Sequence, residues 1–167
     1  MKKQTIQSVL IFAHFCLMMI FLGGVLMENF ISYPNWFYSI PASLEQANNF
    51  YQVRNPGQFF QTVFPLAILT GIGFVIFGWN VKPARNFILM SLLLLICTEI
   101  LTVIFIYPLI GIMLREGTTA HSIDFLKQTA QGFVRANQLR VALFIIGEAL
   151  SFISLWKFIG SKWNRAI

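Results

Sequence analysis

Four long apolar runs, separated by shorter polar segments, divide the chain. The runs cover residues 7–27, 59–79, 87–114 and 139–158. A helix needs ~20 mostly apolar residues to cross a hydrocarbon core ~30 Å thick, because each residue adds ~1.5 Å of rise. Backbone N–H and C=O groups in lipid must be satisfied within the segment, and the runs lack the alternating polarity of barrel strands. The pattern therefore predicts four transmembrane helices.

The two longer connections carry helix signals of their own. In SLEQANNFYQVR, Ser43 and Gln46 have the spacing of a capping box, which predicts a short amphipathic helix at the membrane surface. Asn55-Pro56 has the pattern of an N-cap followed by proline at the first helical position, and Ser122 is suited to cap the last helix. Two helices are therefore expected to begin before their apolar runs. The expected helices are about 7–27, 56–79, 87–114 and 122–158.

The composition agrees with a membrane protein. Of the 167 residues, 57% are hydrophobic and only 11% are charged, whereas about 25% of residues are charged in an average soluble domain. The sequence therefore predicts an all-α membrane protein, a single four-helix transmembrane bundle over residues 1–167 with a short amphipathic helix in the first outer loop. The neighbouring aromatic residues Trp36, Phe37 and Tyr38 are expected in the belt at the membrane interface.

Basic residues lie mostly on one side of the predicted bundle. The acid-free segments at the termini and in the NVKPARN link contain Lys2, Lys3, Lys82, Arg85, Lys157, Lys162 and Arg165. On the other side, basic residues are mixed with acids. Because Lys and Arg accumulate in cytoplasmic segments, both termini are expected in the cytoplasm and the protein in the plasma (inner) membrane. The net charge of +6 follows from this bias, and no basic run indicates nucleic-acid binding.

Two carboxylic acids interrupt the apolar runs. Glu99 lies in LICTEILTV and Glu148 in IIGEALSF, and residue counting places both near mid-membrane at a shared depth. Each acid shares a helix face with other polar residues, and a charge that faces lipid costs at least ~2.5 kcal/mol. We therefore expect the third and fourth helices to be neighbours, with both acids directed into the bundle. Two interpretations stay open: polar groups that hold the helices together, or a site for protons or a ligand.

His14 is the single histidine within an apolar run, and His121 lies in a loop. A haem held by two histidines inside the bundle is therefore not expected. A metal site made of His14 and the two glutamates would lack any ligand spacing of the E-x-x-H kind. We expect His14 to be a packed polar residue of the bundle, and the sequence predicts no metal and no cofactor.

Polar residues gather where the predicted helices meet the outer surface. The candidate ligand-binding residues at this mouth are Glu28, Arg54, Asn55, Tyr107, Asn137 and Arg140. An unpaired guanidinium near the interface costs free energy, so we expect Arg140 to pair with Glu28. The alternative is an Arg140 that snorkels and contacts only headgroups and water. Pro108 is expected to kink the third helix and to free the carbonyl of Ile104 for a polar neighbour.

Two segments resemble a known family. FVRANQLRVALFIIGEALSF has an aromatic residue, then Asn, then Arg, and FIYPLIGIMLREG has a proline after a membrane run. Both resemble the anthrone oxygenase-like family of small four-helix membrane proteins, most of which have no assigned function, and the helix layout resembles that family over nearly the whole chain. The resemblance implies that Pro108, Asn137 and Arg140 are recurrent family positions. Phe133 departs from it, standing where Trp is usual, and Tyr107 stands where Asn often flanks the proline. Fungal members are associated with the oxidation of anthrones, but this sequence contains no redox cofactor motif, so that activity is not expected here.

Three functions remain open from the sequence. The first is a bundle that binds a small, flat hydrophobic molecule, quinone-like or lipid-like, in an outward-facing cavity between helices. The second is a non-catalytic partner subunit or structural module, which acts as a homo-oligomer or with another membrane protein. The third is a proton-coupled transporter that uses Glu99 and Glu148, which four helices would provide only after dimerisation. The sequence does not decide whether the protein is an enzyme.

Overall fold

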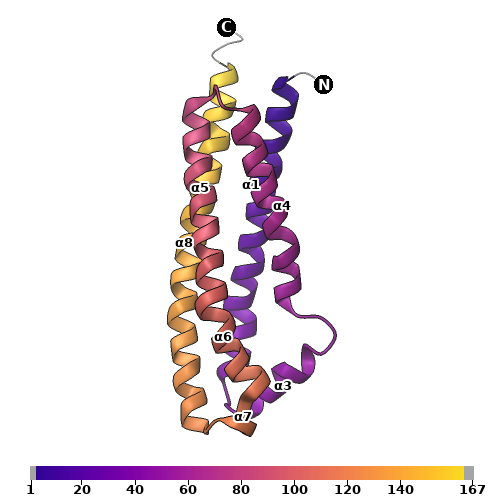
Figure 1. Cartoon of the computed structure of the whole chain (residues 1–167), viewed down its shortest axis with the longest axis vertical. Helices are drawn as coiled ribbons and strands as arrows, with labels where there is room; N and C mark the ends of the chain where they lie inside the picture. Colours follow the sequence, from indigo (N-terminus) through magenta and orange to yellow (C-terminus); the bar gives the residue numbers. More distant parts are fainter. Residues whose placement is uncertain (1–2, 164–167) are drawn as a thin grey trace.

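Four long helices lie side by side along the molecule (Figure 1). The computed structural model describes residues 3–163, and these described residues contain no strand. The bounds of the long helices are α1 (Lys3–Met27), α4 (Pro56–Phe77), α5 (Lys82–Leu101) and α8 (Ile123–Trp163). The all-helical class predicted from the sequence is confirmed. Lys2 and Arg165, which contribute to the charge-based orientation, lie outside the described residues.

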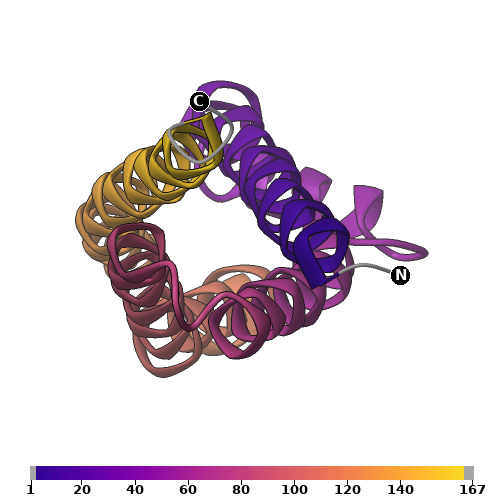
Figure 2. The same ribbon diagram turned by 90° about the horizontal axis from the view of Figure 1, so that it is seen from above.

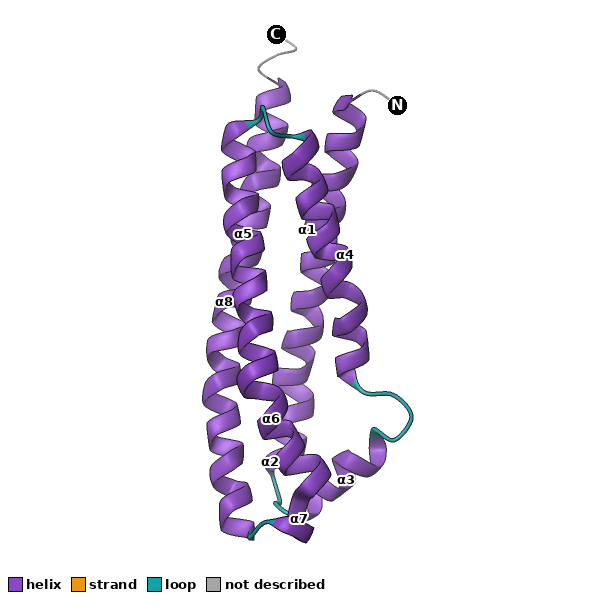
Figure 3. Cartoon of the chain, viewed as in Figure 1, coloured by secondary structure: helices purple, strands orange, loops and turns teal. Residues whose placement is uncertain are grey.

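Seven short elements complete the described chain. They are η1 (Glu28–Ser32), α2 (Tyr33–Phe37), α3 (Ala42–Phe50), η2 (Thr102–Ile106), α6 (Tyr107–Ile110), η3 (Gly111–Glu116) and α7 (Gly117–Ala120). The elements η1, η2 and η3 are π-helical, so a backbone N–H bonds the carbonyl five residues earlier. Because these elements follow α1 and α5 without interruption, the first and third helical rods extend beyond their expected ends. Loops link the helices at the two ends of the bundle, and the loop between α3 and α4 projects from its side (Figure 3).

Viewed along its axis, the bundle has one long helix at each corner of a square (Figure 2). α1 contacts α4 and α8, and α5 contacts the same two helices. Consecutive long helices run in opposite directions, so the N- and C-termini lie at the same end (Figure 1). We call this the terminal end, and we call the opposite end, where α2, α3 and α7 lie, the capped end. This up-and-down order is the simplest arrangement of an antiparallel four-helix bundle.

Large apolar side chains cover the outside of the bundle. Examples from the four long helices are Phe12, Leu69, Leu93 and Phe152, which are 51–65% exposed. Four helical rods are long and apolar enough to cross a membrane: Lys3–Phe37, Pro56–Phe77, Lys82–Ala120 and Ile123–Lys162. An apolar surface that continues around a molecule indicates contact with lipid or with other proteins rather than with water.

Serine hydroxyls hold α5 and α8 together. Oγ of Ser91 donates to the carbonyl of Gly147 (2.8 Å), and Oγ of Ser154 donates to the carbonyl of Ala84 (2.7 Å). Both serines are fully buried or nearly so. In an apolar environment small residues let helix backbones approach, and hydroxyls then bond across the interface. The expectation that the third and fourth helices are neighbours is confirmed.

The register of these bonds places the two acids at different depths. Glu148 follows Gly147 in the chain, so it lies level with Ser91 of α5. Glu99 lies about eight residues further along α5, or ~12 Å closer to the capped end, at the level of Arg140. The predicted shared depth is therefore wrong, because residue counting measured each acid from the ends of its apolar run, and these ends are not level in the bundle.

α1 and α4 approach closely where His14 meets Gly71. Nδ1 of His14 bonds the carbonyl of Ala67 (2.9 Å), and because a carbonyl only accepts, Nδ1 carries the proton. A Cβ at Gly71 would lie 2.9 Å from Nδ1 of His14 and 2.7 Å from Cδ2 of Leu92. The absence of a side chain at Gly71 is therefore what makes room for the imidazole ring.

Two of the expected helix starts are confirmed. Asn55 is the N-cap residue of α4, and the N–H of Phe125 donates to Oγ of Ser122 (3.3 Å) at the start of α8. The expected capping box is wrong. Ser43 lies inside the first turn of α3, where its Oγ donates to the carbonyl of Trp36 (2.7 Å) and so ties α3 to α2.

Trp36 does not belong to an interfacial belt. It is 5% exposed and lies in an aromatic cluster under α3, with its ring centroid 5.2 Å from that of Tyr33 and 6.3 Å from that of Phe133. Tyr38, two residues further, is 71% exposed, as expected for an interfacial residue. The helix periodicity of α2 separates the two, because residues two apart point to different faces.

We expect Gly71→Ala to lower the stability of the bundle, because its Cβ would overpack His14 and Leu92. Overpacking a close helix contact costs ~1–3 kcal/mol. Gly132→Ala is the matched control, since a Cβ at this position of α8 meets nothing within 4 Å and alanine favours a helix by ~0.5–1 kcal/mol over glycine. Thermal unfolding in one detergent should show a lower midpoint only for Gly71→Ala, and equal midpoints would contradict the close packing.

Candidate functional site

A cavity of about 620 Å³ lies between the helices at the capped end. One part of its wall is aromatic and is formed by Phe21, Trp36, Tyr51, Phe60 and Phe144. The other part is polar and includes Glu28, Tyr33, Gln61, Glu99, Thr102, Tyr107 and Arg140. Because the lining residues come from all four helical rods and, through Asn48, from α3, the cavity exists only once the bundle has closed.

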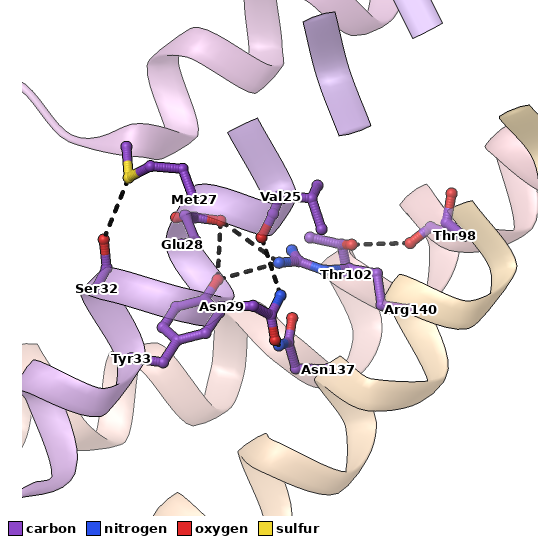
Figure 4. Close-up of polar contacts among 10 residues, drawn as sticks. All are labelled: Val25, Met27, Glu28, Asn29, Ser32, Tyr33, Thr98, Thr102, Asn137 and Arg140. Atoms are coloured by element: carbon purple, nitrogen blue, oxygen red, sulfur yellow. Dashed lines mark hydrogen bonds and ion pairs between the residues drawn. The ribbon is translucent and has the colours of Figure 1, made fainter. Parts of the chain in front are cut away.

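Arg140 lies at the centre of the polar wall, joined to Glu28 and Tyr33 (Figure 4). Its Nη2 donates to the hydroxyl of Tyr33 (3.0 Å), and that hydroxyl donates in turn to Oε2 of Glu28 (2.9 Å). The direct Nη2–Oε2 distance between Arg140 and Glu28 is 3.5 Å, which is long for a charge-assisted hydrogen bond. The predicted pairing of Arg140 with Glu28 is therefore present, and the hydroxyl of Tyr33 bridges the two side chains through its shorter hydrogen bonds.

Burial makes this network energetically important. Glu28, Tyr33 and Arg140 are each 5% exposed. Moving a charge out of water costs several kcal/mol unless a partner compensates it, and removing one partner of a buried pair typically costs ~3–5 kcal/mol. The alternative in which Arg140 snorkels to headgroups and water is contradicted by its burial and by its two side-chain partners.

The π-helical turn η1 brings Tyr33 to Glu28. In an α-helix only residues three and four apart are neighbours on one face, and these two residues are five apart. In η1 the N–H of Tyr33 bonds the carbonyl of Glu28, which closes a wider turn and stacks the two side chains. Pro34 follows directly; it lacks an N–H, and its ring would clash with the preceding turn of a regular helix. The Tyr-Pro pair therefore coincides with the change in helical geometry.

The third rod repeats this arrangement. The N–H of Tyr107 bonds the carbonyl of Thr102 across η2, and Pro108 follows. The kink expected at Pro108 takes the form of π-helical widening on both sides, in η2 and η3. Among the described side chains, no donor bonds the carbonyl of Ile104, so the polar neighbour expected there is not observed. The backbone adapts by changing its own hydrogen-bond pattern instead.

A pair of asparagines lies beside the arginine network. Nδ2 of Asn137 donates to Oδ1 of Asn29 (2.7 Å), and Nδ2 of Asn29 donates to the carbonyl of Val25 (2.9 Å), as Figure 4 shows. Within the described part of the chain, Oδ1 of Asn137 and Nε of Arg140 are enclosed and have no protein partner. One acceptor and one donor are therefore left over, one turn apart on α8, at the edge of the network.

The other sequence-derived candidates divide into three groups. Asn55, Tyr107 and Glu99 line the cavity. Arg54 is exposed and does not line it. His14 and Glu148 are buried closer to the terminal end, beyond the phenylalanines that close the cavity.

Sequence reasoning missed Tyr33, although a signal was present. The dipeptide Tyr-Pro occurs at 33–34 and again at 107–108, each time at the end of a helical run. Both tyrosines line the cavity. Among the described residues, no group of three or more His, Cys, Asp or Glu side chains is placed to hold a metal ion.

The charges that line the cavity balance. The ionisable lining residues other than tyrosine are Glu28, Glu99, Arg115 and Arg140, which sum to zero when all are ionised. A neutral molecule with a polar end therefore suits the cavity better than an ion, because an ion would enter an apolar region without a counter-charge.

Comparison with known proteins gave no relative. No family model matches the chain, and no curated protein and no solved structure matches it either.

We expect Glu28 and Arg140 to be energetically coupled through Tyr33. Glu28→Ala and Arg140→Ala should each lower the thermal stability in detergent, since each leaves a buried charge without its partner. The double variant should lose less stability than the sum of the two single losses, and the difference, the coupling energy, should be ~0.5 kcal/mol or more. Tyr33→Phe should cost ~1–3 kcal/mol, because it leaves buried groups unsatisfied.

The surface pair of Glu116 and His121 provides the control, with Oε2 of Glu116 2.5 Å from Nε2 of His121. Exposed pairs contribute ~0–1 kcal/mol, so Glu116→Ala should have little effect. Strictly additive losses for Glu28→Ala and Arg140→Ala would show that the two residues do not act as a unit.

Proposed function

We propose that the chain is an integral membrane protein whose capped-end cavity binds a small, neutral, flat hydrophobic molecule with a polar oxygen, of the quinone-like or lipid-like kind. The single observation that supports this proposal most directly is the mixed lining of the cavity, aromatic on one part and polar on the other. Pockets for small molecules are mostly apolar, with a few converging polar groups that fix the orientation, and their volumes are about 300–1,000 Å³.

The aromatic wall suits a flat ring or an unsaturated chain. Phe21 and Phe144 are stacked with centroids 4.7 Å apart, and Phe60 packs against Phe21 at 4.9 Å. Aromatic faces stabilise another flat ring by burial and by offset or edge contacts. A ligand that enters between Trp36 and these phenylalanines would be removed from water on both faces.

The polar wall suits a carbonyl or hydroxyl oxygen. The guanidinium of Arg140 is part of the cavity wall, where Glu28 and Tyr33 hold it in place. A fixed donor costs little entropy when a ligand oxygen accepts from it. The resemblance to the anthrone oxygenase-like family points to Asn137 and Arg140. Arg140 lines the cavity, whereas Asn137 lies outside its lining and bonds Asn29. A redox reaction is not part of the proposal, because the chain carries no redox cofactor motif.

The proposed orientation follows the basic residues. With both termini in the cytoplasm of a plasma (inner) membrane, the capped end faces outward, and the cavity opens near the outer leaflet. A hydrophobic ligand would then reach the cavity from the bilayer, where lipophiles concentrate. The partner-subunit and transporter alternatives lack an observation of this kind in their favour.

We expect residues at the capped end to be labelled in intact cells. Gln46→Cys and Ser122→Cys, both at exposed positions, should react with an impermeant thiol reagent, in a background without Cys16 and Cys97. Asn80→Cys, in the link between α4 and α5, is the control and should react only after lysis. The reverse pattern would invert the orientation. Ser43 is unsuitable for labelling, because it is 2% exposed.

We expect a short-chain benzoquinone such as the decyl derivative to quench the fluorescence of Trp36, which lines the cavity. The measurement uses detergent-solubilised protein in which Phe replaces the other three of the four tryptophans. Gly111→Phe should raise the quinone concentration needed for half-maximal quenching at least tenfold. Gly111 lines the cavity and has open space beside it, so the new ring would occupy the place of the ligand.

Gly132→Phe is the matched control, because Gly132 also has open space but lies outside the cavity lining. Quenching that is equal in both variants, or absent in the parent protein, would rule out a quinone-like ligand in this cavity. Stoichiometric co-purification of another membrane protein would favour the partner-subunit alternative instead.

A further inference from the structure

Three buried polar side chains in the middle of the bundle have polar atoms without a partner in the described chain. They are His14 on α1 and Glu148 and Ser151 on α8, which are 0%, 7% and 1% exposed. Nε2 of His14, both carboxyl oxygens of Glu148 and Oγ of Ser151 are enclosed without a hydrogen bond to protein. Buried polar groups are nearly always satisfied, so a cluster of unsatisfied ones requires an explanation.

Contacts between α1 and α8 place the three residues within about one helical turn of each other along the bundle. The rings of Phe15 and Phe152 lie 6.1 Å apart, and a Cβ at Gly147 would lie 3.7 Å from Cε of Met18. His14 and Met18 are one turn apart on α1, and Glu148 and Ser151 lie between Gly147 and Phe152 on α8. The unpartnered atoms therefore belong to facing stretches of two contacting helices.

This level is separate from the capped-end cavity. Phe21, Phe60 and Phe144 line the cavity on the side toward the bundle centre, and their rings pack against each other. Glu148 lies one turn beyond Phe144, toward the terminal end. The polar cluster is therefore not explained by the ligand site, and an inference about it does not rest on the proposed function.

The chemistry of the three groups is complementary. Nδ1 of His14 carries a proton, because it bonds the carbonyl of Ala67, so Nε2 of the neutral ring is an acceptor. A carboxyl group that keeps its proton has one donor, and the hydroxyl of Ser151 can both donate and accept. An ionised carboxylate without a partner is very costly in an apolar interior, whereas a protonated one can donate to an imidazole nitrogen.

We propose that Glu148, Ser151 and His14 form a buried proton-binding site at the centre of the bundle, in which Glu148 carries the proton and shares it with Nε2 of His14 through internal water. When the proton moves, the carboxyl O–H bond breaks and an N–H bond forms on Nε2, which gives a carboxylate and an imidazolium. The net charge of the site is zero in both forms. The proton thus changes helix, from α8 to α1, without a change in total charge.

The surroundings contain few other groups that could take part. The helix α4, which packs against His14, has no titratable side chain. On α5 the nearest acid is Glu99, about two turns closer to the capped end. On α8 the nearest charges are Arg140, which is bound to Glu28 and Tyr33, and Lys157, which is exposed. Cys16, a free cysteine two residues from His14 on α1, is the remaining titratable side chain at this level, and residues two apart point to different helix faces. The proton is therefore assigned to Glu148 and His14.

Infrared spectroscopy tests the proposal on the full chain in detergent or lipid nanodiscs. The parent protein should show the C=O stretch of a protonated carboxylic acid at neutral pH, and the band should shift in D₂O. Glu148→Gln should abolish this band. Glu99→Gln is the matched control, since Glu99 lines the cavity and is only half-buried, and it should leave the Glu148 band unchanged.

The infrared frequency of the Glu148 band tests the role of His14. His14→Gln and His14→Asn should both move the Glu148 band to a frequency typical of a more weakly hydrogen-bonded acid, because the imidazole acceptor is lost. Using two variants guards against misfolding of one, and far-UV circular dichroism of each reports whether the helices form. A missing band in the parent protein, a band that survives Glu148→Gln, or a frequency unchanged in folded His14 variants would each overturn the proposal.

The benzoquinone measurement distinguishes the proton site from the proposed ligand site. Glu148→Gln is isosteric and lies outside the cavity lining. The benzoquinone probe should therefore quench Trp36 fluorescence in this variant as it does in the parent protein. A loss of the carboxylic band with normal quenching supports the proton site alone. Loss of quenching in Glu148→Gln would mean that the two sites are one, which would contradict their separation by the phenylalanines.

Discussion

The desolvated guanidinium of Arg140 is the constraint on which the capped end depends. A charge that is 5% exposed needs permanent partners, and the bundle provides them from the first helical rod, where Glu28 and Tyr33 lie five residues apart. Only the π-helical turn η1 brings these two onto one face. The first rod continues from this turn into α2, and the hydroxyl of Ser43 ties α3 to α2. One buried charge thus connects helix geometry, the cap and the cavity wall.

Polar groups in this bundle are concentrated at two levels, and aromatic rings separate them. The ring of Phe21, packed against those of Phe60 and Phe144, closes the cavity toward the bundle centre. On the capped side, polar groups are joined in a network with a few free donors and acceptors. On the other side, Nε2 of His14 and both carboxyl oxygens of Glu148 have no protein partner. Physical separation of this kind places the proposed ligand site and the proposed proton site at different depths of the bundle.

The long helices are held by small residues and hydroxyls rather than by interlocking large side chains alone. Ser91 and Ser154 bond across α5 and α8 in opposite directions, and Gly71 leaves room for the ring of His14. Between helices in lipid, burial of apolar surface gives little net gain, because lipid chains are as apolar as the protein core. Close contact and hydrogen bonding then decide which helices are neighbours.

The sequence by itself determined the helical class and the four apolar rods, since these depend on composition and periodicity. It also predicted that Arg140 pairs with a carboxylate, because a lone buried charge is costly. It did not determine Tyr33 as the bridge or Trp36 as a buried residue, because a regular helix places Tyr33 away from Glu28. It also misplaced Glu99 relative to Glu148. Depth depends on how helices slide past each other, and bonds such as Ser91 to Gly147 fix that register only when the tertiary structure forms.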